Sequence, residues 1–171
     1  QVNGDWYCIY NNSSVVKNFA NIGTWRYYFD SKTGILETGA AANGIFTVGT
    51  AVYYCEPGTG AINRSGKLLW QGEGENRTLS YFDGNGKRYT GWLNLRDGSV
   101  TNRYYFQPAD GTAVTGSVKI GNYFYYFDTV TCTLQRNAQD VIQGKNQAGE
   151  EAVYYTGRYE YLLSGWQKVG Q

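Results

Sequence analysis

Residues 90–128 read TGWLNLRDGSVTNRYYFQPADGTAVTGSVKIGNYFYYFD, in which Thr-Gly pairs alternate with Tyr-Tyr-Phe clusters. The pairs lie at 90–91 and 115–116 and the clusters at 104–106 and 125–127, and Asp110-Gly111 stands between a cluster and the next pair. Tyr and Phe favour strands, whereas Gly and Asp favour tight turns. The stretch therefore predicts a strand, a Gly-Asp turn and a second strand in each unit, which is a β-hairpin.

The same aromatic cluster recurs along the whole chain at intervals of roughly 20 to 29 residues. The second aromatic position of each cluster gives seven markers: Tyr7, Tyr28, Tyr54, Tyr81, Tyr105, Tyr126 and Tyr155. Other positions keep the same register, because a Gly follows four of these markers after 10 or 11 residues: Gly39, Gly91, Gly116 and Gly165. A chance richness in Tyr would not produce this register, so we interpret the chain as a repeat array.

A single hairpin of this size buries too little apolar surface to be stable alone in water. Its neighbours must complete the core, as in a solenoid whose repeats stack on one another. We therefore predict an all-β solenoid, a superhelical stack of β-hairpin repeats, with residues 1–171 as a single array of about seven repeats. Residues 56–80 fit the pattern least well and are either a degenerate repeat or a long loop. We expect the array to be a fragment of a longer polypeptide that carries further domains.

The composition excludes several classes of function. The 171 residues include no His, which excludes mechanisms that need an imidazole as a general base or as a zinc ligand. Lys and Arg number 15 against 14 Asp and Glu, so no basic excess favours nucleic acid as a partner. No apolar run reaches the roughly 18 residues of a membrane span. We expect no metal, no cofactor and no membrane insertion.

The three cysteines, Cys8, Cys55 and Cys132, cannot all pair within the chain. Cys8 and Cys55 fall where other units carry Phe, so we interpret them as small buried hydrophobic residues. A disulfide is the alternative. Because no His, basic partner or ligand spacing surrounds them, we expect them to carry neither catalysis nor metal.

The unit Gly-x-x-x-Tyr-Tyr-Phe-Asp, followed by a Gly-containing turn and Thr-Gly, resembles the cell-wall-binding repeats of choline-binding proteins, streptococcal glucan-binding domains and the receptor-binding tails of large clostridial toxins. Residues 90–128 and 22–39 match this pattern best. The resemblance implies a non-catalytic module of a bacterial protein, secreted or on the cell surface. It also implies that the partner is a cell-wall polymer or another glycan, such as a glucan.

The chain departs from the choline-binding members of the family, whose aromatic rings form a cage around a quaternary ammonium. In those members one ring comes from a Gly-Trp pair and another from a Trp directly before Tyr-Tyr. Here the Gly-Trp pair occurs only at Trp92 and Trp166, and Arg26 and Arg103 stand before two Tyr-Tyr pairs, where an Arg would repel choline. We therefore favour a glycan over choline-type teichoic acid, which is kept as the alternative ligand.

Exposed rings between successive units are the candidate ligand contacts, because a sugar stacks its C–H face on a ring while polar side chains bind its hydroxyls. We predict these ligand-binding residues: Trp92, Arg103, Tyr105, Phe124, Tyr126, Trp25, Tyr28 and Tyr54. Trp92 is expected to meet Tyr105 and then Tyr126, so that Trp92→Ala weakens binding while Trp166→Ala changes it little. The alternative interpretation of each ring is that it only packs the core.

Two other classes of function compete with a binding module. One is a structural spacer or adhesin stalk that binds nothing. The other is a glycosidase-like enzyme, since 14 carboxylates include enough for an acid and base pair. Five of these carboxylates stand in the turn register, where we expect them to cap backbone amides: Asp30, Glu56, Asp83, Asp110 and Asp128.

Overall fold

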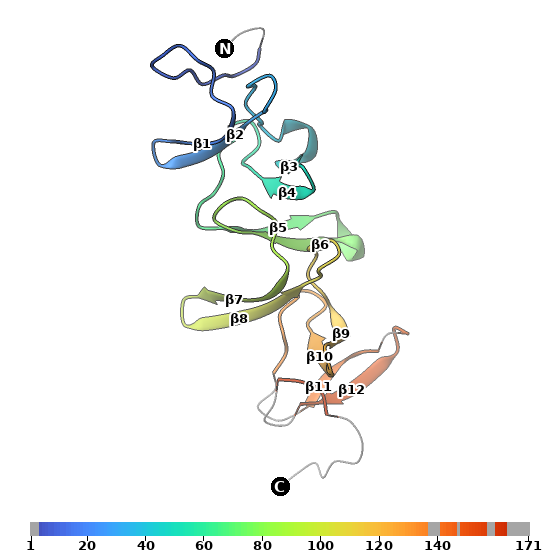
Figure 1. The fold of residues 1–171 in the computed structure, drawn as a ribbon. Coiled ribbons are helices and arrows are strands. Elements are labelled where there is room, and N and C mark those ends of the chain that lie inside the picture. Colours follow the sequence, from blue (N-terminus) through green and yellow to red (C-terminus); the bar gives the residue numbers. More distant parts are fainter. Residues whose placement is uncertain (1–3, 137–140, 147, 157–159, 164–171) are drawn as a thin grey trace. The chain divides into compact units, whose positions relative to one another are not determined.

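The computed structural model describes residues 4–136, 141–146, 148–156 and 160–163, and its chain divides into two compact units, residues 1–89 and 90–171. The described residues form antiparallel hairpins and two short 3-10 segments, Ala40–Ala42 and Gly74–Asn76, with no α-helix among them (Figure 1). The all-β hairpin prediction is confirmed. The single array of about seven repeats stays a prediction, and each unit is described below by itself.

The first unit contains three two-stranded antiparallel sheets (Figure 1). They pair β1 with β2, β3 with β4 and β5 with β6, and the strand bounds are Asn18–Ile22, Trp25–Phe29, Ile45–Val48, Ala51–Tyr54, Lys67–Gln71 and Thr78–Phe82. The stretch at 56–80, predicted to be the least regular, consists of a loop up to β5 and then most of the third hairpin.

The second unit contains three further sheets of the same kind. They pair β7 with β8, β9 with β10 and β11 with β12, and the strand bounds are Gly91–Asp97, Val100–Phe106, Gly116–Ile120, Tyr123–Phe127, Val141–Lys145 and Glu151–Tyr155. The two repeats within the well-matching stretch 90–128 thus become the neighbouring hairpins β7–β8 and β9–β10. Their markers are equivalent, because Tyr105 pairs with Trp92 as Tyr126 pairs with Ser117, one residue after each second Gly.

The long ladders form around a different turn from the one that the sequence predicted. The turn between paired strands is the apolar-Gly turn, as at 22–24 between β1 and β2, where Gly23 has a φ of 60°. The predicted Asp-Gly turn instead follows the second strand, and a single antiparallel bridge closes it, as between Phe29 and Leu36 or between Phe127 and Leu134. The physical reason is that several extended residues flank the apolar-Gly turn on both sides, whereas the Asp turn is extended on one side only.

The Asp carboxylates hold these second turns, as predicted. Asp30 Oδ1 accepts hydrogen bonds from the backbone N–H groups of Lys32 at 2.9 Å and Thr33 at 2.7 Å. The hydrogen bond from Thr33 is the main reason why the pKa of Asp30 is lowered. The same capping occurs at three further turns: Asp83, Asp110 and Asp128.

The core is built from the third position of the Tyr-Tyr-Phe clusters. Its phenylalanines are at most 2% exposed: Phe29, Phe82, Phe106 and Phe127. Cys55 occupies the same position and is 1% exposed, so its interpretation as a buried hydrophobic residue is confirmed. Cys8 is only partly buried, because a single bridge between Ile9 and Val15 stands where other repeats have a full ladder.

Candidate functional site

Two hairpins, one in each unit, carry an aromatic ring and an Arg in the same register. In β1–β2, Phe19 lies opposite Tyr28, and the guanidinium of Arg26 lies 4.4 Å from the Phe19 ring centroid. In β7–β8, Trp92 lies opposite Tyr105, and the guanidinium of Arg103 lies 4.3 Å from the Trp92 ring centroid. These distances are within the range of a cation–π interaction, so each hairpin stacks a cation of its own chain on its own ring.

In the first unit this ring belongs to a packed cluster. Phe19 lies 4.8 Å from Tyr28 and 4.9 Å from Tyr53 between ring centroids, and Phe46 lies 5.5 Å from Tyr28. Arg26 is held from its other side, since its Nη1 donates a hydrogen bond of 2.5 Å to Asn85 Oδ1. Tyr28, a predicted ligand residue, is therefore half-buried and packs against other rings. The neighbouring Phe19 ring already carries the Arg26 guanidinium.

In the second unit Trp92 packs equally closely. Its ring centroid lies 5.2 Å from Tyr105, 5.0 Å from Tyr125 and 5.8 Å from Phe127. Contact with Tyr105 was expected, but the ring of the next hairpin is Tyr125 rather than Tyr126. Alternate residues of a strand face opposite sides, so Tyr126 points away, is 5% exposed and lies 5.0 Å from Tyr154.

The hairpin β9–β10 carries the same two positions with different residues, and a groove lies beside them. Ser117 stands opposite Tyr126, where Trp92 stands opposite Tyr105, and Phe124 takes the place of Arg103. The groove has a volume of about 490 Å³, and its lining residues are Ser117, Asn122, Tyr123, Phe124, Tyr154, Tyr161, Leu162 and Leu163. All of them belong to the second unit. We call this feature the Phe124 groove.

Two partly exposed aromatic side chains line the Phe124 groove. Tyr123 is 50% exposed and Phe124 is 42% exposed. The ring of Tyr123 stacks on that of Tyr161 with centroids 4.4 Å apart, and the backbone N–H of Leu162 donates a 2.6 Å hydrogen bond to the carbonyl of Phe124. The segment 160–163 therefore runs beside β10, and residues of both line the groove.

The groove combines apolar faces with a few polar groups. Ser117 and Asn122 contribute hydroxyl and amide groups, the tyrosines contribute phenol groups, and the Lys119 ammonium lies 5.9 Å from the Phe124 ring centroid. This mixture suits a ligand with flat apolar patches and many hydroxyl groups. The described lining residues include no carboxylate.

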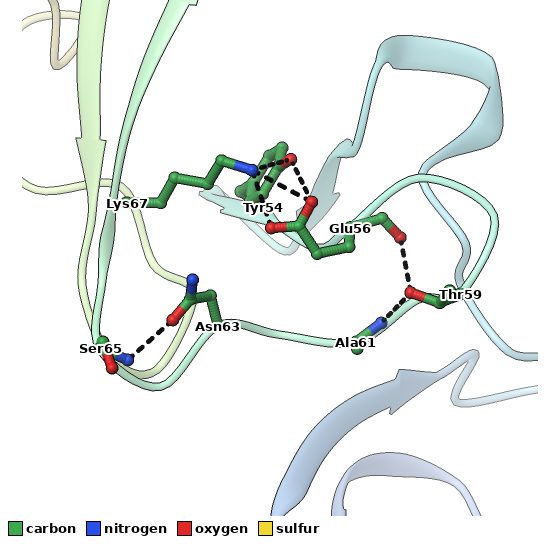
Figure 2. A network of polar contacts seen from close by, with 7 residues as sticks. All are labelled: Tyr54, Glu56, Thr59, Ala61, Asn63, Ser65 and Lys67. Carbon is green, nitrogen blue, oxygen red and sulfur yellow. Dashed lines mark hydrogen bonds and ion pairs between the residues drawn. The ribbon is translucent and has the colours of Figure 1, made fainter.

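Tyr54, another predicted ligand residue, belongs to a closed polar network in the first unit (Figure 2). It is 4% exposed, and its hydroxyl donates a 3.0 Å hydrogen bond to Glu56 and accepts one of 2.9 Å from Lys67. Lys67 Nζ also lies 2.8 Å from Glu56 Oε1. The hydrogen bond from Lys67 lowers the pKa of Glu56, and burial raises the pKa of Tyr54.

This network corrects the expectation that the Glu56 side chain caps its turn. Glu has one methylene more than Asp, so its carboxylate reaches beyond the turn to Lys67 on β5. Trp25, by contrast, is 50% exposed, at the tip of β1–β2 opposite Ile22. Of the predicted residues, Phe124 and Trp25 thus present an exposed ring, whereas Tyr54 and Tyr126 are buried.

Of the residues that line the Phe124 groove, sequence reasoning identified only Phe124, and it missed three aromatic ones: Tyr123, Tyr154 and Tyr161. Tyr123 had a usable signal, because it follows Gly121-Asn122 as the exposed Trp25 follows Gly23-Thr24. Tyr161 had no such sequence signal, because the residues around it do not follow the Tyr-Tyr-Phe repeat. Trp166, the second Gly-Trp position, lies outside the described residues.

The cysteines offer no chemistry to this site. All three are free, and Cys55 and Cys132 are buried. Burial is the main cause that raises the pKa of the Cys55 thiol to about 12, so this thiol is protonated at neutral pH. Across the described part of the chain, no group of three His, Cys, Asp or Glu side chains is placed to hold a metal ion. Nor is any described helix long and apolar enough to cross a membrane.

Comparison with known proteins gives a match in structure only. No family model and no curated protein matches the chain. Choline-binding protein F from Streptococcus pneumoniae, in the presence of a tetrasaccharide-pentapeptide peptidoglycan analogue, is similar at 22% identity and a TM-score of 0.61, with 94% of this chain and 44% of that chain covered. A second crystal form of that protein matches at 23% identity and a TM-score of 0.56, with 86% and 44% covered.

The complex of the same protein with ipratropium matches at 24% identity and a TM-score of 0.57, with 86% of this chain and 42% of that chain covered. At such identities the likeness shows the fold, which is the β-hairpin fold of choline-binding protein F. The chain spans less than half of the length of these structures.

Proposed function

We propose that this chain is a non-catalytic module that binds a bacterial cell-wall polymer or another glycan, and that the Phe124 groove is its binding site. The single observation that carries the proposal is the pair of exposed aromatic side chains, Tyr123 and Phe124, that line one groove. A sugar ring has the flat C–H face that such a groove accommodates. The fold shared with choline-binding protein F, named for choline and seen with a peptidoglycan analogue, supports the same assignment.

The arrangement of the carboxylates also supports a non-catalytic role. The turn aspartates accept backbone hydrogen bonds, and Glu56 and Glu160 are in ion pairs. A module of this kind would attach a secreted or surface protein to a polymer, and further domains of the same polypeptide would set the biological purpose. One site of this size binds weakly, and repeated contacts along a polymer raise the overall affinity.

Choline-type teichoic acid is the second candidate ligand. The open aromatic groove favours it, because a quaternary ammonium is attracted to ring faces. Lys119 disfavours it, since its ammonium lies 5.9 Å from the Phe124 ring centroid and would repel a second cation. The packed rings at Phe19 and Trp92 already carry Arg26 and Arg103 and leave no place for choline there.

Pull-down on purified cell walls, on dextran and on a choline matrix tests the proposal, with affinities measured by calorimetry. Tyr123→Ala and Phe124→Ala are each expected to weaken binding by about 1 to 2 kcal/mol, or roughly 5- to 30-fold, as the loss of a stacked ring does. The matched control is Val100→Ala, an apolar truncation at a side chain 58% exposed on the tip of β7–β8. A wild-type protein that binds none of the three supports would instead favour a structural spacer.

A further inference from the structure

A cluster of two arginines and one glutamate adjoins the Phe124 groove. Glu160 Oε1 lies 2.9 Å from Arg136 Nη1, and Glu160 Oε2 contacts Arg103 Nη1. Glu160 begins the segment 160–163, whose next residues stack on Tyr123 and bond to Phe124. The cluster and the groove are therefore built on the same segment of the second unit.

The Glu160 carboxylate is shared between two arginines. A guanidinium presents a planar fork that binds a carboxylate or phosphate through two parallel N–H groups. Here Arg103 and Arg136 each pair through Nη1 with a different oxygen of Glu160, and the buried Nε–H of Arg103 has no hydrogen-bond partner among the described residues. The Glu160 side chain thus spans two cations and uses only part of their hydrogen-bonding capacity.

The cluster is also accessible from solvent. The side chains of Arg103, Arg136 and Glu160 are 28%, 51% and 34% exposed. Ion pairs that are partly exposed are weaker than fully buried ones, so an anionic group from solvent can compete with Glu160. Arg103 would keep its orientation without Glu160, because its guanidinium stacks on the Trp92 ring.

We propose that Arg103 and Arg136 form a subsite for the anionic group of an acidic polymer, and that Glu160 occupies this subsite when no polymer is bound. The inference rests on the proposed function, because it adds an anionic subsite beside the sugar-binding groove. The anionic group would bind between the guanidinium groups of Arg103 and Arg136 while its sugar or polyol lies against the aromatic side chains of the groove. The chemistry is shared by two sources, the carboxylate of a uronic acid and the phosphodiester of a polyol phosphate chain.

The test measures binding of three polymers of similar length by calorimetry: polygalacturonate, poly(glycerol phosphate) and neutral dextran. Arg136→Gln is expected to weaken binding of at least one polyanion by about tenfold and to leave dextran binding unchanged. Glu160→Gln removes the internal competitor and is expected to strengthen polyanion binding by about threefold to fivefold. The polyanion that shows both effects identifies the source of the anionic group.

Matched controls separate a site from general electrostatics. Glu151→Gln on β12 and Arg96→Gln on β7 make the same charge changes in the same unit at exposed positions. Thermal unfolding of every variant allows affinity to be compared per folded molecule. Equal effects of Glu160→Gln and Glu151→Gln, or of Arg136→Gln and Arg96→Gln, would overturn the subsite.

The outcomes also separate this inference from the proposed function. If Tyr123→Ala abolishes binding of a polymer while neither Arg136→Gln nor Glu160→Gln alters any polyanion affinity, the groove stands and the anionic subsite is wrong. If the wild-type protein binds no polymer of the three and no cell wall, both proposals fall together. Polyanion binding that depends on Arg136 and is strengthened by Glu160→Gln supports both.

Discussion

Replacing Trp92 by alanine is expected to destabilise the second unit by about 3 kcal/mol. The ring has aromatic neighbours at Tyr105, Tyr125 and Phe127, each within 6 Å between centroids, and such pairs contribute about 0.5 to 1.5 kcal/mol each. The Arg103 cation–π contact adds about 0.5 to 1 kcal/mol. A fully buried Trp truncated to Ala loses about 3 to 5 kcal/mol, and the half-buried Trp92 belongs at the lower end.

Urea unfolding followed by amide hydrogen exchange measures this change. The chain has five tryptophans, so exchange of the β7–β10 amides reports on the second unit more directly than total fluorescence does. With an m-value of about 2 kcal/mol per molar urea, the midpoint should fall by about 1.5 M. The matched control is Trp25→Ala, which truncates the same side chain where it is 50% exposed and should cost less than about 1 kcal/mol.

A loss below about 1 kcal/mol for Trp92→Ala, or a loss equal to that of Trp25→Ala, would refute the packing argument. Weaker glycan binding per folded molecule with unchanged stability would show that Trp92 is a ligand contact, as the sequence suggested. The structure favours stability as the quantity that changes, since Trp92 packs against rings and the cation of its own chain.

Three further changes have defined outcomes. Gly144→Ala should destabilise β11–β12 by about 1 to 3 kcal/mol in thermal unfolding, because the added methyl would collide with the hydroxyl and ring carbons of Tyr126. Burial raises the pKa of Asp128, but the hydrogen bonds within its turn outweigh burial, so the pKa is lowered. The stabilisation by the ionised Asp128 is therefore complete above about pH 4 and is lost as the pH falls through the lowered pKa. Asp128→Asn should flatten this dependence of the melting temperature on acid pH. In thiol titration at pH 8, the partly exposed Cys8 should react in the native protein, and Cys55 should react only after unfolding.

Most of the fold could be predicted from the sequence because each hairpin is made of two strands that are consecutive along the chain. Each strand pairs with the next strand along the chain, and the aromatic register repeats with it. The buried phenylalanine positions and the Asp-capped turns followed from alternation and from the length of the Asp side chain. The choice between the two turns of each unit did not follow, because both contain Gly and only the flanking extended residues distinguish them.

The candidate site was less predictable, because it depends on a segment without repeat character. Phe124 was identified from the sequence, but Tyr161 and Glu160 lie in the irregular stretch that follows β12. Their contacts with Tyr123 and Arg103 join residues that are distant along the chain. A one-dimensional pattern gives the register of neighbouring strands, whereas it does not show which side chains a non-repeating segment brings back to them.

Two side-chain positions differ among three of the hairpins and determine what covers the aromatic ring beside the marker Tyr, the second aromatic residue of each cluster. One lies opposite the marker Tyr and the other lies two residues before that Tyr. Together they hold a ring with an arginine in two hairpins and a small residue with a ring in a third: Phe19 with Arg26, Trp92 with Arg103, and Ser117 with Phe124. A stacked guanidinium covers the ring face in the first two cases, whereas in the third Phe124 remains 42% exposed, with the Lys119 ammonium 5.9 Å from its ring centroid.

The double variant Ser117→Trp/Phe124→Arg transfers the closed arrangement of β7–β8 to β9–β10. The added ring and its guanidinium should fill the Phe124 groove, so that affinity for any polymer bound by the wild type falls by about tenfold or more. The hairpin should keep its fold, because the same pair stacks in the same register in β7–β8. Calorimetry and thermal unfolding measure the two quantities, and Val100→Ala again serves as the control. A double variant that melts like the wild type and still binds with unchanged affinity would show that the polymer does not bind in this groove.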